Sequence, residues 1–231
     1  MKNLKKIDFV NIIFFICCVV SDICYMFVPA SEYITKTIAS LVFVVCGMVN
    51  LIYIQKHTTD YPESPKFRWF MMIGLISACL GDIFLIDFFV IGVTFFALGH
   101  VFYFISFCGI QKVEIKDLFC GLAIFIPSLL LILFYKGFDF EGMQFLIIIY
   151  ALIISCMVGK TISNLINQKS RKNLLLLCGS ILFFLSDFML LFRLFAGIGR
   201  YGSLLCVIFY YPAQFLLAWS IEVVSKRTTK E

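Results

Sequence analysis

The sequence predicts an all-α integral membrane protein, a bundle of eight transmembrane helices with both termini in the cytoplasm. Its 231 residues are 62% hydrophobic and only 14% charged, which is too little charge to cover the surface of a soluble domain. Eight apolar runs approach the roughly 20 residues that cross a bilayer as a helix. Basic residues gather in alternate loops, which predicts the orientation. We therefore expect residues 1–231 to form a single integral-membrane domain.

The eight predicted spans follow one another with short connections. The first run follows Lys2, Lys5 and Lys6, but it is too long for a signal peptide and no clear cleavage site comes after it, so we expect a retained helix. Asp87 alone separates the third and fourth spans, and the glycine-rich AGIGRYG separates the seventh and eighth, so both connections are predicted to be tight turns. Pro212 is expected to break the last helix. The spans lie at about 8–28, 35–54, 68–88, 90–110, 116–135, 144–163, 173–194 and 202–224.

The orientation follows from the distribution of Lys and Arg. With eight spans, the two termini and the second, fourth and sixth loops share one side of the membrane. When Lys160 is counted with its neighbouring loop, that side carries all but four of the 19 Lys and Arg, the exceptions being Lys36, Lys136, Arg193 and Arg200. Basic loops stay in the cytoplasm, so we expect both termini there and the protein in a bacterial inner (plasma) membrane. The net charge of +5 thus reports topology, and because no basic stripe alternates with aromatics outside the spans, no nucleic-acid partner is expected.

Neither cysteines nor histidines indicate a cofactor. The ten cysteines lie within or beside the spans without any C-x-x-C pair, as expected of small apolar residues. Only His57 and His100 are present, and His57 lies in a loop, so zinc is not supported. A metal held mainly by carboxylates stays open, although nothing in the sequence requires one. We expect no cofactor and no metal.

Three aspartates interrupt the apolar runs, and each follows a small residue. Asp22, Asp82 and Asp187 each lie about 14 residues from the cytoplasmic start of their helices, or about 21 Å at 1.5 Å per residue. Those helices run in the same direction, so the carboxylates are predicted to share a similar depth. Acids within spans are costly and usually functional, which makes Asp82 and Asp187 the candidate site. Asp22 is the weaker candidate, because Ser21 and nearby backbone could hold it.

Other polar residues of the spans are expected to turn inward with the acids, since they cannot face lipid cheaply. His100 and Tyr103 share one helix face, as do Tyr211 and Gln214, with Tyr210 next to that face. These residues could equally be hydrogen-bond links between helices. Lys36 and Arg193 lie at the outer boundary, where they could instead extend to lipid headgroups.

Three motifs resemble the YhhN-like lysoplasmalogenase family across essentially the whole chain. They are GDIFLIDFFVIGVTFFALGHVFYFISF at 81–107, GSILFFLSDFMLLFRLF at 179–195 and YYPAQFLLAWS at 210–220. Lys36 also matches a family lysine. The resemblance implies hydrolysis of the vinyl-ether bond of lysoplasmalogens, which yields a fatty aldehyde and glycerophosphoethanolamine or glycerophosphocholine. It assigns the family's two essential aspartates to Asp82 and Asp187, and it makes a lysophospholipid and the surrounding membrane lipids the expected partners.

Vinyl-ether chemistry suits two buried acids. The bond resists bases and nucleophiles but yields to acid, so an enzyme needs a donor that keeps its proton near neutral pH and a base for water. Environments that separate the pKa values of two neighbouring acids can supply both. We expect one of Asp82 and Asp187 to be the donor and the other the base, and the sequence leaves the assignment open. The supporting roles fall to further residues: Asp22, Lys36, His100, Tyr103, Arg193, Tyr210, Tyr211 and Gln214.

Two other classes of function stay open. Acids at matched depth also suit a transporter coupled to protons or cations, although no inverted repeat is visible. In a purely structural or sensory bundle, the acids would instead pair with Lys36, Arg193 and His100. A serine lipase is disfavoured, because the sequence has no Gly-x-Ser-x-Gly elbow and no Ser-His-Asp arrangement.

Overall fold

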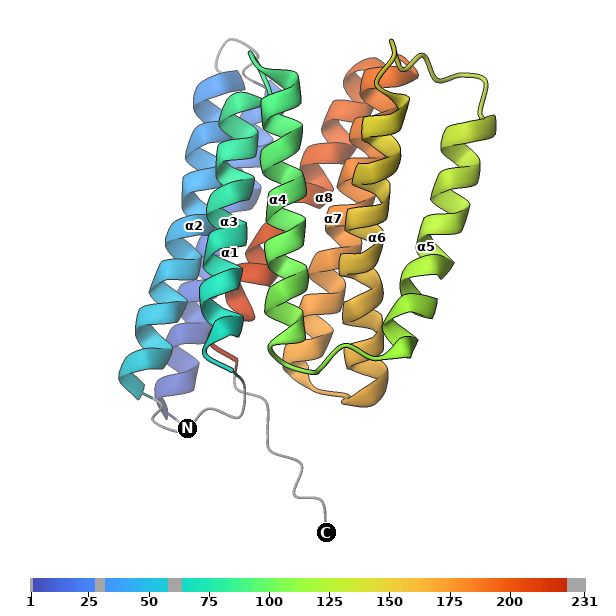
Figure 1. Ribbon diagram of the computed structural model, residues 1–231. Coiled ribbons are helices and arrows are strands. Elements are labelled where there is room, and N and C mark those ends of the chain that lie inside the picture. Colours follow the sequence, from blue (N-terminus) through green and yellow to red (C-terminus); the bar gives the residue numbers. More distant parts are fainter. Residues whose placement is uncertain (1, 28–31, 58–63, 224–231) are drawn as a thin grey trace.

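The chain forms an all-helical bundle (Figure 1). The computed structural model describes residues 2–27, 32–57 and 64–223, except for the side chains of residues 2–5, 21–27, 32, 33 and 35. Each of the predicted spans corresponds to one helix. The helices are α1 (Lys2–Phe27), α2 (Glu32–His57), α3 (Lys66–Phe84), α4 (Phe89–Cys108), α5 (Ile115–Phe134), α6 (Gln144–Asn167), α7 (Arg171–Phe195) and α8 (Gly199–Trp219).

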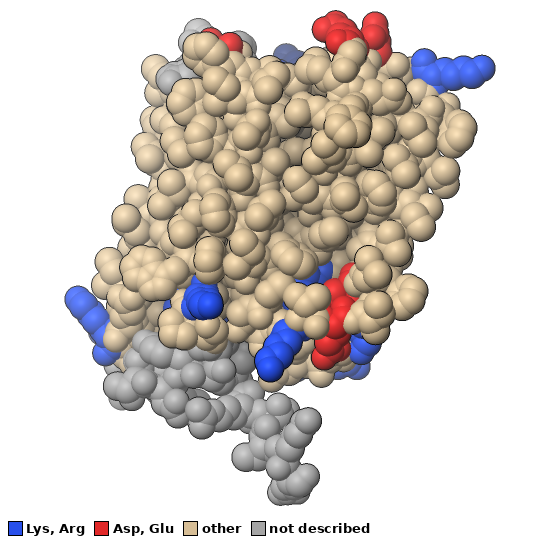
Figure 2. All heavy atoms as spheres, in the orientation of Figure 1, with Lys and Arg blue, Asp and Glu red and all other residues tan. Residues whose placement is uncertain are grey.

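The surface of the bundle is that of a multi-pass membrane protein. Over the described residues, the seven helices α2 to α8 are long and apolar enough to cross a membrane. Figure 2 shows a broad band without Lys, Arg, Asp or Glu on the face in view, with the charged side chains toward the two ends. We call the end at which α1 begins and α8 ends the basic end, and the opposite end the far end.

Helix packing leaves α5 at the edge of the bundle. Helices that follow one another pack side by side, except that α4 packs on α6 and not on α5. α8 contacts α1, α2, α3 and α7, so it joins the two halves of the bundle. Among the described helices, the backbone of α5 contacts that of α6 alone (Figure 1). This arrangement places α3, α4, α6, α7 and α8 around a common interior.

Both predicted tight turns are present. α3 and α4 are joined by residues 85–88, and a Cβ on Gly92 would lie 2.5 Å from the Leu85 Cα, so only glycine lets α4 return this closely. Between α7 and α8, Gly197 and Gly199 have φ values of +70° and +56°, a backbone conformation that suits glycine.

The predicted break at Pro212 is wrong. α8 continues from Gly199 to Trp219 with Pro212 inside it. Proline removes one helical hydrogen bond, but neighbouring helices can hold the segment in place. Here Tyr210, Tyr211, Ala213 and Gln214 on both sides of the proline are buried, so packing keeps the helix intact.

Candidate functional site

Asp82 is held near the far end of α3 by groups from two other helices. Its side chain is buried. The Ser40 hydroxyl of α2 donates a hydrogen bond to its Oδ2, and the Tyr210 hydroxyl of α8 donates to the same oxygen at 2.8 Å. Ser40 Oγ also lies 2.8 Å from the carbonyl oxygen of Lys36, one turn earlier. The carboxyl group thus links α2, α3 and α8.

Asp187 of α7 is held by an imidazole and a phenol. The Tyr150 hydroxyl of α6 donates to its Oδ2 at 2.7 Å, and His100 Nε2 of α4 lies 3.0 Å from the same oxygen. His100 Nε2 and the Tyr150 hydroxyl are themselves 2.9 Å apart. The sequence predicted Asp187 and His100 to lie inside the bundle, and the structure brings both together with Tyr150.

The surroundings of His100 indicate its tautomer. The ring is fully buried, and among the described residues its Nδ1 has no hydrogen-bond partner. A buried N–H without an acceptor is costly. The ring is therefore best described as neutral, with its proton on Nε2 facing Asp187 and Tyr150.

The two acids share a polar cavity of about 440 Å³. Lys36 and Arg193 line it with them, and Lys36 lies close enough to interact electrostatically with Asp82. Asp82 and Asp187 are also near enough for their charges to interact. The remaining lining residues of the polar cavity are Leu85, Phe96, Ser186, Leu190, Cys206, Val207, Tyr210 and Tyr211.

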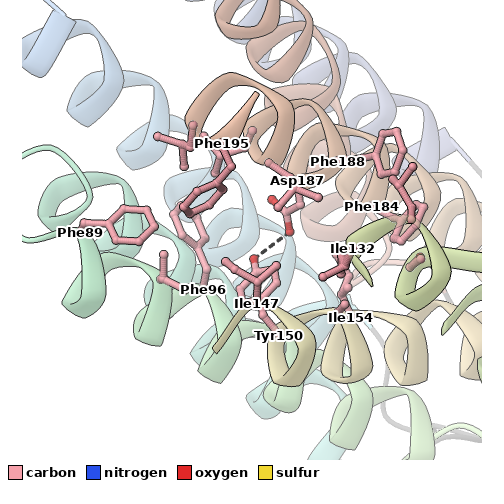
Figure 3. A pocket seen from close by; sticks show the side chains of 17 residues that line it. Phe89, Phe96, Ile132, Ile147, Tyr150, Ile154, Phe184, Asp187, Phe188 and Phe195 are labelled. Carbon is pink, nitrogen blue, oxygen red and sulfur yellow. Dashed lines mark hydrogen bonds between the residues drawn. The ribbon is translucent and has the colours of Figure 1, made fainter. Parts of the chain in front are cut away.

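A second, apolar cavity of about 690 Å³ lies between α4, α5, α6 and α7. Figure 3 shows Asp187 and Tyr150 hydrogen-bonded within it and surrounded by aromatic and aliphatic side chains. Asp187, Phe96 and Leu190 line both cavities. The Asp187 carboxyl group therefore lies where the polar and apolar cavities meet.

Tyr103 and Gln214 were predicted to belong to the site but lie outside both cavities. The Tyr103 hydroxyl donates to Gln214 Oε1 at 2.7 Å, which links α4 to α8. Phe183 packs between this pair and the acids. Its ring centroid lies 4.5 Å from that of His100 and 5.3 Å from that of Tyr210. The pair therefore lies next to the aromatic residues that pack around the acids.

The other predicted site residues have different outcomes. Lys36, Arg193, Tyr210 and Tyr211 line the polar cavity, and the Tyr211 hydroxyl is 3.5 Å from the carbonyl oxygen of Lys36. Asp22 lies in α1, but its side chain falls outside the described residues. In the part of the chain that is described, no three His, Cys, Asp or Glu side chains gather as a metal site would require.

Sequence reasoning missed Ser40, Ser186 and Cys206. Ser40 bonds Asp82, while Ser186 Oγ and Cys206 Sγ, 3.3 Å apart, line the polar cavity. A signal existed for Ser40, because it lies one helical turn after Lys36 and so on the same face. Cys206 resembles the other cysteines of the spans, and nothing in the sequence sets it apart.

Comparison with known proteins gives one match. The family model described as the YhhN family matches residues 31–221. This range includes both acids, Lys36 and all of α8, and it covers more than half of the chain. Searches of curated proteins and of solved structures found no match.

Proposed function

The chain belongs to the YhhN family, and we propose that it hydrolyses the vinyl-ether bond of lysoplasmalogens by acid–base catalysis with Asp82 and Asp187. The substrates would be 1-alkenyl-glycerophosphoethanolamine or 1-alkenyl-glycerophosphocholine. The products would be a fatty aldehyde and the corresponding glycerophosphodiester. Family membership supports this class of hydrolase. The polar and the apolar cavity match the polar and the apolar part of such a substrate.

One observation carries the proposal: the two acids share a polar cavity, and Asp187 also lines an apolar one. A lysoplasmalogen has its reactive bond at the boundary between a polar glycerophosphate and a long hydrocarbon chain. A carboxyl group at the junction of a polar and an apolar cavity matches that boundary. Binding of the chain in the apolar cavity would hold the vinyl ether beside both acids.

The chemistry needs only the two carboxyl groups and one water molecule. The acid transfers its proton to the β-carbon of the alkene, which makes an oxocarbenium ion. The second carboxylate takes a proton from water as the water oxygen bonds to the α-carbon, which gives a hemiacetal. The hemiacetal then collapses: its hydroxyl proton returns to the first acid, the glycerol oxygen leaves with the proton of the second, and the aldehyde forms. Both acids recover their starting protonation states.

The anionic carboxylate also has an electrostatic role. It lies near enough to its partner for their charges to interact, and it would stabilise the positive charge of the oxocarbenium ion. Tyr150 and His100 on one side, and Ser40 and Tyr210 on the other, hold the carboxyl groups in position before the substrate binds.

Lys36 and Arg193 are proposed to bind the lipid phosphate. Both line the polar cavity and lie near the far-end termini of α2 and α7. Guanidinium and ammonium groups form strong hydrogen bonds to phosphate oxygens. Phosphate binding there would place the glycerol next to the acids.

The same proposal includes a topology. All eight helices would span a bacterial inner membrane as a single domain, with the basic end and both termini in the cytoplasm. The support is the excess of Lys and Arg at the basic end. The polar cavity, with Lys36 and Arg193, would then lie toward the outer leaflet.

Aldehyde release tests the function directly. Detergent-purified protein is incubated with lysoplasmalogen and, as the control, with an ester-linked lysophospholipid of the same chain length. We expect aldehyde from the vinyl ether and no fatty acid from the ester. Proton- or cation-driven flux in liposomes without any aldehyde would instead favour the transporter.

A further inference from the structure

We propose that the lipid chain reaches Asp187 sideways from the bilayer, through an entrance between α5 and α7. This inference rests on the proposed function, because it takes the chain to be that of the lipid substrate. The ligand class is a single long hydrocarbon chain, still attached to its polar headgroup.

The apolar cavity has walls on two helices whose described backbones do not come into contact, although their side chains belong to one hydrophobic cluster. Leu131 and Ile132 of α5 line one side, and Phe188 and Leu191 of α7 line the other, although α5 and α7 share no backbone contact. Leu194 of α7 lines the cavity and is also 42% exposed. The cavity therefore reaches the lipid-facing surface of the bundle along α7.

The far end of the apolar cavity is closed by aromatic residues. Two phenylalanines of the connection between α5 and α6 pack on α7. The ring centroids of Phe138 and Phe192 are 5.0 Å apart, and those of Phe140 and Phe195 are 5.2 Å apart. The Asp139 N–H also donates to the Phe195 carbonyl oxygen at 2.8 Å. This cover stands at the far end of the apolar cavity, so the approaches that are left are the polar cavity and the flank that faces lipid.

The basic end of α5 is anchored to α6, so an entrance beside α5 would lie along its far half. A Cβ on Gly159 of α6 would lie 2.4 Å from the Gly121 nitrogen of α5, which shows how closely the two backbones approach. Nearby, Lys160 Nζ forms a buried ion pair of 2.7 Å with Asp117. Beyond this anchor, the buried residue of α5 is Ile132. The far half of α5 thus stands beside the cavity as a wall, where Ile132 packs in one cluster with residues of α6 and α7.

The composition of the cavity fits a hydrocarbon chain. Its polar side-chain groups are those of Asp187, Tyr150 and Ser128. The Tyr150 hydroxyl bonds Asp187, and Ser128 Oγ lies 2.9 Å from the Ile124 carbonyl oxygen of its own helix. A chain entering here would keep its methylene groups in apolar surroundings along the whole path, and its first carbons would stop at Asp187.

Photolabelling can locate the chain. The probe is a non-hydrolysable 1-alkyl lysophospholipid with a diazirine in mid-chain, added to the full-length protein in membranes and mapped by peptide mass spectrometry. We expect labels on the far half of α5 and on residues 184–195 of α7. Labelling confined to α1 and α2 would overturn the proposal.

Two adjacent leucines of α5 provide a matched pair of variants. Leu131 lines the apolar cavity, whereas Leu130 is 50% exposed and lines neither cavity. Leu131→Trp should reduce α7 labelling and kcat/KM for a long-chain lysoplasmalogen by about tenfold, as expected when a bulky ring fills a binding pocket. Leu130→Trp should change neither quantity, and equal effects of the two variants would contradict a lateral entrance.

The outcomes separate the entrance from the proposed function. Aldehyde release without labelling of α5 and α7 would overturn the entrance alone. Labelling of α5 and α7 without aldehyde release from wild-type protein would overturn the hydrolase and support lipid binding in the cavity. If Leu131→Trp does not elute as a folded protein, the labelling pattern of wild-type protein decides.

Discussion

Each of the two intramembrane carboxyl groups accepts two hydrogen bonds through one oxygen, Oδ2. Asp82 accepts from Ser40 and Tyr210, and Asp187 from Tyr150 and His100. One oxygen of each carboxyl group is thus held in place by two groups of the protein.

Removal of the Tyr150 hydroxyl tests this positioning. Tyr150→Phe keeps the ring but deletes the 2.7 Å hydrogen bond to Asp187. Because a hydrogen bond to a carboxylate contributes about 1.5–3 kcal/mol, we expect kcat for aldehyde release to fall roughly tenfold or more, with little change in KM. Tyr201→Phe, at a tyrosine that is 79% exposed, is the control. An unchanged kcat in Tyr150→Phe would exclude a positioning role.

The pH dependence follows from carbon protonation. The donor must carry its proton when the vinyl ether binds, so the rate should fall as the pH rises and the donor ionises. Initial rates of aldehyde release between about pH 6 and about pH 10 measure this. A flat profile over that range would argue against a carboxylic acid as the donor.

At the residue scale, the sequence pointed to the two aspartates more clearly than to the side chains that form hydrogen bonds with them. An aspartate inside an apolar run is visible because its placement is costly, and this signal made Asp82 and Asp187 the candidate site. Which hydroxyl reaches which carboxylate depends on the rotation of five helices about their axes, which spacing within a single helix does not determine. Ser40 was missed and Gln214 was assigned to the site for this reason.

At the scale of helices, close backbone contact between α5 and α6 makes a specific prediction. A Cβ on Gly159 would meet the Gly121 backbone at 2.4 Å, whereas a Cβ on Gly121 would have its nearest neighbour at an ordinary 3.6 Å. Gly159→Ala should therefore push the helices apart and cost about 1–3 kcal/mol. Gly121→Ala should be tolerated.

Thermal unfolding in detergent, monitored by size-exclusion chromatography, measures this difference in stability. We expect a lower midpoint temperature for Gly159→Ala than for Gly121→Ala. Equal midpoints in the two variants would show that the α5–α6 contact is not as close as described.

Helix bounds could be predicted from hydrophobic runs, and the error at Pro212 shows the limit of local rules. The run lengths and turn residues predicted α2 to α7 within four residues of their observed bounds, whereas α1 begins six residues earlier and α8 ends five residues earlier than predicted. A proline rule, however, considers only the hydrogen bond lost within one helix. The packing of α8 against four other helices is a tertiary effect that no local pattern contains.

At the scale of the whole molecule, the arrangement of the helices was not predictable. Matched depth suggested that the acids could meet, but depth does not say which helices are neighbours. Because α4 packs on α6, α5 lies outside the helices that surround the common interior. The same arrangement creates the apolar cavity. Loop lengths alone would equally allow α4 to pack on α5.

The proposed topology can be tested with reporters fused after Glu231. A green fluorescent protein at this position should fluoresce in a bacterial host, and an alkaline phosphatase there should be inactive, because both would lie in the cytoplasm. An active phosphatase fusion would reverse the orientation and move Lys36 and Arg193 to the cytoplasmic leaflet.

Hydrolysis by two acids in one cavity is tested most directly by aldehyde release from lysoplasmalogen with wild-type protein and three purified variants. Asp82→Asn and Asp187→Asn should each lose about a hundredfold or more of the rate, as expected when an acid or base is removed. Asp87→Asn, at an exposed aspartate in the turn after α3, should retain the wild-type rate. Folded Asp82→Asn or Asp187→Asn protein that releases aldehyde as fast as wild type would contradict the two-acid mechanism.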